Sequence, residues 1–508
     1  MTKTTTGRGG FDAPFVLAID VGSSSVKAAL FDSRARMLDH TAVRVAHRIH
    51  PTHDGGVEEV PDHLVSNVEE AVDGVMRRAG AESELVAAVG MDTMASAVMG
   101  VDGRGRAVTP IYTYADTRPQ QDVDAIKGSI DEELVHQRTG CVQHPSYLPG
   151  RFLWLRRTDP ETARSVITWM DPGTYLYRRW FGADHVAASY SIASWTGMLD
   201  RHQLKWDGEM LRLTGLEESS LPPLADYTHA MSGLARPFAA RWPTLSDVPF
   251  FLAVGDGASA NVGSGCVSPD SVALTIGTSG ALRVLTAEAS PAVPPGLWAY
   301  RLSKATLLGG ALSDGGSVVE WARSTLRLPD DQAELDRVLL GMEPAAHGLA
   351  ALPFLSGERS PGWFGDATAA FAGLRVTSTA EQMLQALLEA TAYRFAKVWE
   401  LLRPHAADDA SIIASGGAIN RTRYWPQLVA DVLGRHVVQC VEPEATSRGT
   451  AVLALRAAGL WQSLSDVGPK LGNTYHPDPE RVRIYQDGQK NHDILYDVLV
   501  RRDISWYK

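Results

Sequence analysis

The stretch Phe15–Asp32, FVLAIDVGSSSVKAALFD, decides the fold class of this chain. Two apolar runs flank a turn of glycine and serine residues, and this pattern predicts a β-hairpin. The hairpin carries a carboxylate at Asp20 and a cation at Lys27. Gly22 lets backbone N–H groups approach an anion closely, and the serine hydroxyls add donors. The hairpin is therefore a candidate phosphate cradle with a metal-facing carboxylate, although an ordinary hairpin with a polar tip has the same pattern.

A second segment, Val272–Leu285 (VALTIGTSGALRVL), repeats the order of strand, turn and strand. The second copy has Thr275 before its glycine motif and lacks the acid. Two such hairpins, half a chain apart, indicate two similar domains that each offer a hydroxyl-rich loop to one polyphosphate, although short segments can also match by chance. The alignment superposes Ile19 on Ile276, Gly22 on Gly277, Ser23 on Thr278 and Ser24 on Ser279.

Length, composition and charge limit the class of protein. The chain has 508 residues, too many for one core, so we expect two large domains. Its 44% hydrophobic and 21% charged content is typical of a soluble globular protein, and no apolar run approaches the ~18 residues of a membrane span. A net charge of −11 without a basic cluster argues against nucleic acid or anionic membrane as a partner. Three widely spaced cysteines argue against a disulfide frame or zinc site and for a reducing compartment, the cytoplasm.

The rest of the chain alternates between strand and helix patterns, which indicates an α/β fold. The periodicity predicts a long amphipathic helix over 381–403. A break between two halves is expected at 263–271, which is rich in glycine, serine and proline. Strands are expected at 84–92, 249–254 and 411–414, and a further hairpin around 97–105.

A carboxylate at the end of a predicted strand marks the segment VGDGASANVG, 254–263. Asp256 lies where a buried strand gives way to a helix of small residues, and ligands of α/β folds usually bind at such strand ends. A general base for a sugar hydroxyl requires an anchored carboxylate of this kind. From the residues alone, a helix N-cap is the favoured role for Asp256.

Two further clusters have a chemical and a plain interpretation. In ASGGAINR (414–421), the glycine pair allows a flat ring to lie against bare backbone, but it also suits a tight turn with positive φ. In YTYADTR (112–118), Asp116 and Arg118 suit polyol hydroxyls, but a surface ion pair is the commoner explanation.

These motifs together resemble the FGGY carbohydrate kinases, within the actin/hexokinase/heat-shock-ATPase superfamily. The segment HPSYLPGRFLWLRRTDPE (144–161) looks like the first signature of the family, with Arg151 where Lys is usual. The segment AAFAGLRVTSTAEQMLQALLE (369–389) fits the second signature closely. The resemblance covers roughly residues 15–460, with the motifs in the expected order.

The resemblance implies two actin-like (ribonuclease H-like) domains with the active site in the cleft between them. It also implies phosphorylation of a sugar or sugar acid that depends on ATP and Mg²⁺. Dimers are common in the family, so a homodimer is compatible with this chain. The implied divisions are a loose N-terminal tail (1–14), an N-terminal kinase domain (15–264) for sugar binding, the first phosphate loop and the catalytic base, a nucleotide-binding domain (265–460), and an extension (461–508) that is packed on the second domain and ends in a helix (489–501).

The resemblance further implies a role for each matching residue. Asp256 falls at the position of the general base, and Asp20 at the metal-facing position. The nucleotide contacts would come from Gly22, Ser23, Ser24, Lys27, Gly277, Thr278, Gly416, Gly417 and Arg421. The sugar pocket would be lined by Met94, Asp116, Ser146, Asp256 and Gly257.

Within the family, the chain is most similar to bacterial gluconate kinases and next to xylulose kinases. Gly257 follows the base as in gluconate-type members, where the xylulose branch typically has Asn. The Met-His pair that is common to both branches is here Met94-Ala95, which removes an imidazole from the sugar pocket. Loss of the imidazole suits a different or smaller polyol. From the similarity to gluconate kinases, the expected reaction is D-gluconate to 6-phosphogluconate, with xylulose or another pentulose, tetrulose or polyol as the alternative. A carboxylate substrate requires a cation, and the candidates are Arg118, Arg151 and Arg359.

Two functions outside sugar phosphorylation use the same fold. A catalytically silent nucleotide-dependent binding protein has no need of both Asp20 and Asp256. An actin- or chaperone-type ATPase leaves the FGGY signatures and the Asp256 segment unexplained. Release of ADP with and without sugars distinguishes these functions from a kinase.

Overall fold

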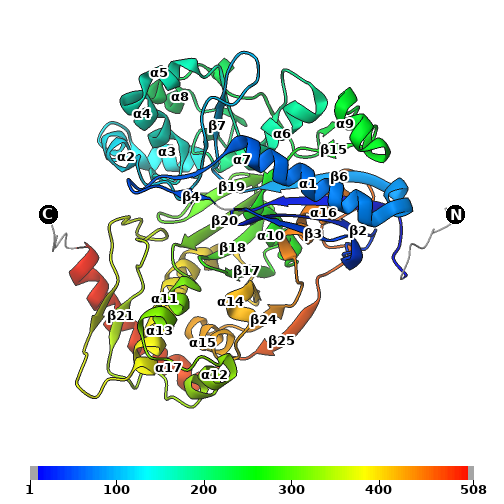
Figure 1. The fold of residues 1–508 in the computed structure, drawn as a ribbon. Helices are drawn as coiled ribbons and strands as arrows, with labels where there is room; N and C mark the ends of the chain where they lie inside the picture. Colours follow the sequence, from blue (N-terminus) through cyan, green and yellow to red (C-terminus); the bar gives the residue numbers. More distant parts are fainter. Residues whose placement is uncertain (1–9, 48, 502–508) are drawn as a thin grey trace.

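The computed structural model describes residues 10–47 and 49–501, which form two α/β units stacked on one another (Figure 1). Each unit is built on a seven-stranded sheet within the described residues. Residues 1–9 of the expected loose tail lie outside the described part of the chain. The expectation of a loose tail is wrong for residues 10–14, because Phe11 packs against the first core and Asp12 pairs with Arg36 at 3.2 Å.

The first sheet confirms the N-terminal hairpin and adds a parallel neighbour. Strands β1 (Phe15–Val21) and β2 (Ser25–Phe31) are antiparallel, with Asp20 opposite Lys27. Strand β6 (Val86–Thr93) runs parallel to β1 and brings Asp92 beside Asp20. The sheet is completed by β3 (Val43–Ala46), β14 (Ala230–Met231), β15 (Phe250–Phe251) and β16 (Val254–Gly255).

The strand expected at 249–254 is divided into β15 and β16, both buried and both paired with β6. The carbonyl of Phe251 accepts a hydrogen bond from the Tyr177 hydroxyl, and that of Ala253 accepts one from the Ser189 hydroxyl. Between β15 and β16, side-chain hydrogen bonds thus take the place of backbone hydrogen bonds to a neighbouring strand. Asp256 follows directly after β16.

The second sheet repeats the hairpin, as the sequence predicted. Strands β17 (Ser271–Ile276) and β18 (Gly280–Thr286) are antiparallel, and β23 (Ser411–Ser415) runs parallel to β17. On β18, Leu282 and Val284 belong to the core of this unit, while the alternate residues face the other unit. The remaining strands are β19 (Trp298–Leu302), β20 (Ala305–Leu312), β24 (Val437–Cys440) and β25 (Leu471–Tyr475).

Helices α10 (Asp256–Gly263) and α16 (Ala445–Ala457) join the two units (Figure 1). They cross with their backbones nearly in contact, since a Cβ at Gly263 would lie 1.7 Å from the Ala445 carbonyl oxygen and one at Gly449 would lie 1.8 Å from that of Ser259. Helix α16 comes from the second half of the chain but packs on β1 and β6 of the first sheet. One apolar cluster therefore contains residues of both halves, such as Val16 and Ala451.

The long helix α13 (Ala380–Leu402) matches the predicted span within one residue at each end. Thr379 and Gln382 form a reciprocal capping box at its start, which satisfies two free backbone donors. The turn predicted near 97–105 is present after β7 (Met99–Val101), closed by a bridge from Val101 to Ala107, although β7 pairs mainly with β9 (Thr168–Met170).

The C-terminal extension contributes more structure than the expected helix. Helix α17 spans Pro479–Tyr496, beginning before the predicted 489–501, and it packs on α13, α15 (Tyr424–Leu433) and β21 (Ala350–Leu352) of the second unit. Trp461 instead donates to the Ser33 carbonyl oxygen of the first unit at 2.8 Å. Within the described residues, no helix is both long and apolar enough to cross a membrane.

Shorter elements surround the two sheets. The first unit contains helices α1 (Pro61–Ala79), α2 (Gln120–Lys127), α3 (Glu132–Thr139), α4 (Leu148–Thr158), α5 (Pro160–Ser165), α6 (Pro172–Phe181), α7 (Tyr190–Ser194), α8 (Gly208–Thr214) and α9 (Arg236–Arg241). The second contains α11 (Ser317–Thr325), α12 (Gln332–Leu340) and α14 (Gly417–Asn420). The short strands are β4 (His50–Pro51), β5 (Val57–Glu59), β8 (Ile111–Tyr112), β10 (Ala188–Ser189), β11 (Leu199–Asp200), β12 (Lys205–Trp206), β13 (Leu224–Ala225) and β22 (Ala370–Ala372).

Candidate active site

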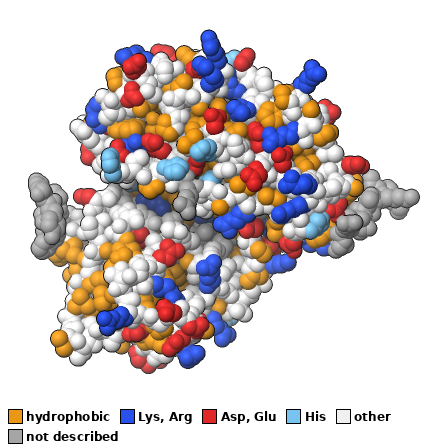
Figure 2. Space-filling model, in the orientation of Figure 1, with side chains coloured by type: hydrophobic (Ala, Val, Ile, Leu, Met, Phe, Trp, Pro, Cys, Tyr) orange, Lys and Arg blue, Asp and Glu red, His pale blue; other side chains and the backbone are white. Residues whose placement is uncertain are grey.

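A cavity of about 260 Å³ lies between the two units, where the surface is hollowed in Figure 2. The first unit contributes Ala95, Ser146, Trp195 and Asp256 to its lining. The second unit contributes strand residues of β17 to β20 and the loop that carries Arg359. We call this space the interdomain cavity. Both halves of the chain are needed to form it.

Asp256 reaches this cavity from the first turn of α10. The N-cap of α10 is Gly255, so Asp256 does not have the capping role that the sequence left open. Its Oδ1 accepts a hydrogen bond from the Gly257 amide at 2.8 Å. Burial raises the pKa of Asp256, and the Arg283 charge opposes that rise. A carboxylate held in this way is suited to accept a proton from a ligand hydroxyl.

One wall of the interdomain cavity is an aromatic stack that the sequence did not reveal. The Trp195 and Tyr300 rings lie 3.8 Å apart between centroids, and the Tyr300 and Trp298 rings lie 4.3 Å apart. A Cβ at Gly257 would lie 2.6 Å from Cη2 of Trp195, so the indole occupies the space of a larger side chain at that position. The glycine after the base is thus required by packing against Trp195.

A second polar group lies at the ends of β1 and β6. Burial is the main reason that the pKa of Asp20 is raised to about 6, and the pKa of the adjacent Asp92 is raised well above its ordinary value for the same reason. Lys27 lies 3.7 Å from Asp20 and forms a closer ion pair, 2.7 Å, with Glu444 at the start of α16. Thr450 donates to Asp92. The sequence placed Asp92 at a strand end but gave it no role.

The residues around Asp20 fit a magnesium ion that arrives with a polyphosphate. Within residues 10–47 and 49–501, no group of three or more His, Cys, Asp or Glu side chains is arranged to hold a metal. Mg²⁺ typically takes only one or two carboxylates and completes its shell with water and phosphate oxygens. A bound cation would also relieve the repulsion between Asp20 and its acidic neighbours, which contributes to its raised pKa.

Another cavity, of about 350 Å³, opens beside the β17–β18 turn in the second unit. Gly277, Thr278, Gly417 and Arg421 line it, together with apolar side chains of α12, α13 and α15. Gly416 does not line it, but its φ of +107° turns the chain, and a Cβ there would lie 2.4 Å from the Ile276 carbonyl oxygen. Both interpretations of the glycine pair apply, since Gly416 makes the turn and Gly417 leaves bare backbone at the cavity.

Other predicted residues lie elsewhere than expected. Met94 is buried in the first core, and its neighbours Ala95 and Ser96 line the interdomain cavity in its place. Asp116 does not line the cavity either, because its buried carboxylate is paired with Arg118 at 2.5 Å. The pair is buried, so it is not the surface pair that the sequence left open.

The three small residues expected to bind phosphate from the first hairpin lie in the turn between β1 and β2. Gly22, Ser23 and Ser24 form the β1–β2 turn, where the Gly22 amide donates to the Ser25 carbonyl oxygen at 3.2 Å. A Cβ at Gly22 would lie 3.4 Å from Oδ1 of Asp20, so the turn adjoins that carboxylate. These three residues line neither of the two cavities just described.

The three arginines considered for a carboxylate substrate differ in whether they line the interdomain cavity. Arg118 is paired with Asp116, and Arg151 donates to the carbonyl oxygens of Ser96, Thr113 and Pro145. Only Arg359 of the three lines the interdomain cavity. Arg283, which the sequence did not single out, lines it as well.

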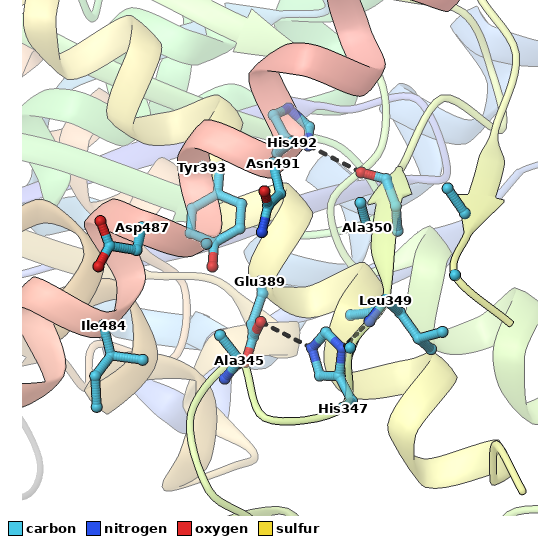
Figure 3. Close-up of a pocket in the computed structure, with 16 residues that line it drawn as sticks. Ala345, His347, Leu349, Ala350, Glu389, Tyr393, Ile484, Asp487, Asn491 and His492 are labelled. Carbon is cyan, nitrogen blue, oxygen red and sulfur yellow. Dashed lines mark hydrogen bonds and ion pairs between the residues drawn. The ribbon is translucent and has the colours of Figure 1, made fainter. Parts of the chain in front are cut away.

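A cavity of about 500 Å³ between α13, α17 and β21 lies wholly within the second unit (Figure 3). His347 and Glu389 form a buried pair at 3.0 Å, and His492 bonds to the Ala351 carbonyl oxygen at 2.8 Å. No predicted site residue lines this cavity. It does not bring the two units together around a ligand, so it is not the candidate active site.

Comparisons with known proteins agree with this geometry. Residues 15–263 match the N-terminal domain, and residues 272–458 the C-terminal domain, of the FGGY family of carbohydrate kinases. A gluconokinase of Bacillus subtilis (strain 168) is 25% identical over 497 residues, covering 96% of this chain and 95% of that protein. A xylulose kinase of Escherichia coli (strain K12) is 26% identical, covering 95% of this chain and 99% of that protein. The crystal structure of gluconate kinase from Lactobacillus acidophilus superposes with a TM-score of 0.89 at 25% identity, covering 96% of this chain and 98% of that one.

Proposed function

Because this chain belongs to the FGGY family of carbohydrate kinases, we propose that it phosphorylates D-gluconate with ATP to give 6-phosphogluconate. The family membership makes it a sugar phosphotransferase, and the choice of substrate is our proposal. The observation that carries the proposal is the interdomain cavity, where a buried carboxylate and two arginines face the same space. A carboxylate can accept a hydroxyl proton there, and a cation can attract the charged end of a sugar acid.

In this proposal, Asp256 accepts the proton of the substrate hydroxyl as the hydroxyl oxygen attacks the γ-phosphorus, the bond from that phosphorus to the bridging oxygen breaks, and ADP leaves. Gly277 and Thr278 would contact the nucleotide phosphates from the β17–β18 turn, and the β1–β2 turn would do so from the other side. Phosphoryl transfer requires little covalent help from a protein, so positioning and charge neutralisation dominate. Mg²⁺ held near Asp20 would supply part of that neutralisation when it is bound with ATP.

The remaining nucleotide contacts belong to the proposal as well. Gly417 and Arg421 line the cavity beside the β17–β18 turn, where the adenine and ribose of ATP would lie. Leucine side chains of α12 and α13 line the same space and suit a flat apolar ring. Lys27 would take part only after exchanging one of its present carboxylate partners for a phosphate, because Asp20 and Glu444 both contact it.

Phosphorylation of xylulose or another neutral sugar is the second candidate, since the xylulose kinase relative is as similar as the gluconokinase. One feature of the cavity favours the sugar acid. Gly257 packs against Trp195 and leaves no room for the Asn of the xylulose branch.

A coupled assay of ADP release tests the proposal with a panel of acceptors: gluconate, D-xylulose, L-ribulose, D-ribulose, erythritol and glycerol. We expect release to depend on the sugar and to be fastest with gluconate. ADP release without any sugar would support a protein-coupled ATPase, and none with any acceptor would support a silent binding protein. A faster reaction with a neutral sugar would exclude gluconate as the preferred substrate.

We further infer that the enzyme works in the cytoplasm and that a homodimer is compatible with it. The support for the first is chemical: Cys141, Cys266 and Cys440 are buried free thiols, as expected in a reducing compartment. Light scattering of the purified protein measures the oligomeric state directly.

A further inference from the structure

Arg283 occupies an unusual place at the interdomain cavity. It lies on β18, with Ala273 and Gly309 as its neighbours across the sheet. Side chains alternate along a strand, and Leu282 and Val284 are directed into the core of the second unit. Arg283 is therefore directed to the opposite face, towards α10 and the first unit. It is 6% exposed and lines the cavity together with Asp256.

The guanidinium of Arg283 is not satisfied by the protein. Its Nη1 is buried without a hydrogen-bond partner, and it forms no ion pair with any carboxylate in residues 10–47 and 49–501. Burial lowers the pKa of Arg283 to about 10 against the attraction of the Asp256 charge, so the group remains charged at neutral pH. A buried, charged and unpartnered donor is costly unless a ligand pairs with it.

A second unpartnered donor lies in the same cavity. Nε1 of Trp195 is buried and donates to no partner among the described residues, and the ring itself lines the cavity. Arg359 differs from both, because its Nη2 already donates to the Leu312 carbonyl oxygen at 2.9 Å and its guanidinium lies over the Tyr114 ring. The buried side-chain atoms of this lining that have no hydrogen-bond partner among the described residues are therefore both donors, and one of them carries a positive charge.

We propose that Arg283 binds the carboxylate of the acceptor and so selects sugar acids over neutral sugars and polyols. A carboxylate supplies the hydrogen-bonded acceptor oxygens that Arg283 lacks in the protein, where the Asp256 charge attracts it without forming an ion pair, and the planar guanidinium suits bidentate pairing with a carboxylate. This inference rests on the proposed phosphorylation of a sugar acid. It adds that Arg283 is the residue that distinguishes sugar acids from neutral sugars.

The test compares D-gluconate with D-glucitol, which has the same carbon chain but a hydroxymethyl group in place of the carboxylate. The variants are Arg283→Met, which removes the charge, and Arg283→Lys, which keeps it. Arg301→Met is the matched control, because Arg301 is a buried arginine on strand β19 of the same sheet that does not line the cavity. Circular dichroism and thermal unfolding establish that each variant is folded.

Wild-type enzyme should prefer gluconate in kcat/KM. In Arg283→Met, kcat/KM for gluconate should fall by about 30-fold or more, and for glucitol by less than about threefold. Arg283→Lys should retain part of the preference, and Arg301→Met all of it. An equal loss with both acceptors in Arg283→Met would overturn the inference, because Arg283 would then serve the phosphate or Asp256. Loss of the preference in Arg359→Met alone would overturn it as well.

Titration calorimetry without nucleotide separates this inference from the proposed function. If the wild-type enzyme phosphorylates only neutral sugars, it is still a carbohydrate kinase, but the role of Arg283 is wrong. If it phosphorylates no acceptor, the proposed function fails. The calorimetric affinities for gluconate and glucitol then test the role of Arg283 on their own. Tighter binding of gluconate than of glucitol, lost in Arg283→Met, supports it. Equal binding of the two by the wild-type protein overturns it.

Discussion

Burial of Asp20 should lower the stability of the folded protein, and Asp20→Asn should restore it. Asp20 is 4% exposed, and its surroundings raise its pKa from 3.8 to about 6. The main cause is loss of solvation, with repulsion from Asp256 and Glu444 added, and the attraction to Lys27 offsets only part of it. The ionised side chain is thus worse accommodated in the fold than in the unfolded chain.

The sign and size of the change in the free energy of unfolding follow from proton linkage. Because the pKa is raised in the fold, the folded state holds its proton to higher pH than the unfolded state does. The free energy of unfolding therefore falls as pH rises from about 4 to about 6 and then stays lower by about 3 kcal/mol. Asparagine has nearly the same shape and no charge. Asp20→Asn should then stabilise the protein by about 3 kcal/mol at pH 8 and by about half of that at pH 5.

Urea unfolding of both proteins at pH 5 and pH 8, followed by circular dichroism, measures this difference. Asp102→Asn is the matched control, because hydrogen bonds from Arg106 lower the pKa of the partly exposed Asp102 to about 2. A lowered pKa gives stability that is complete above the unfolded value, so this control should lose the same stability at both pH values. The reasoning is refuted if Asp20→Asn brings no gain at pH 8, or the same gain at pH 5.

Three further predictions concern the active site and its supports. Asp256→Asn should keep ATP binding but lower kcat by ~10²–10⁴-fold, and near-normal turnover would remove Asp256 from the role of base. Gly257→Ala should lower the free energy of unfolding by about 1–3 kcal/mol, because the new methyl meets the stacked Trp195 ring, and Trp195→Leu in the same chain should restore part of it in urea titrations. Gly416→Ala should cost about 1–3 kcal/mol in the same titration, since its φ of +107° and its contact with Ile276 both exclude a side chain. An unchanged midpoint would show that this turn can relax.

Local sequence patterns predicted the secondary-structure elements that depend on residues close together in the sequence. Both hairpins depend on apolar runs that flank short polar turns. In each, the two apolar runs pair as antiparallel strands across the turn. The long helix α13 follows from its periodicity and from the Thr379–Gln382 capping box. The same patterns placed Asp256 after a buried strand, because a strand end and a run of small residues are visible in the chain itself.

Contacts between distant segments could not be read in this way. Asp92 adjoins Asp20 only because β6 runs parallel to β1, and no residue near Asp92 indicates that pairing. Met94 was expected in the sugar pocket, but it is buried in the first core, and the cavity is lined by the next residue, Ala95. Asp116 was expected there too, and its pairing with Arg118 removes it. Near Met94 and Asp116, the neighbouring Ala95 and Tyr114 line the interdomain cavity instead, because the sequence does not determine which way each side chain points.

Arg283 shows why the charge of a strand residue has to be judged from the whole fold. The alternation Ala281, Leu282, Arg283, Val284 predicts an arginine on the outer face of a sheet, where water would satisfy it. In the folded chain that face is covered by α10 and by Trp195 of the first unit, and no acceptor among the described residues pairs with Nη1, although the Asp256 charge attracts the guanidinium. An unpaired guanidinium in such a position lowers the stability of the free enzyme. A carboxylate ligand removes that penalty, and a neutral sugar does so only in part, so the same buried charge that weakens the empty fold would also discriminate between the two acceptors.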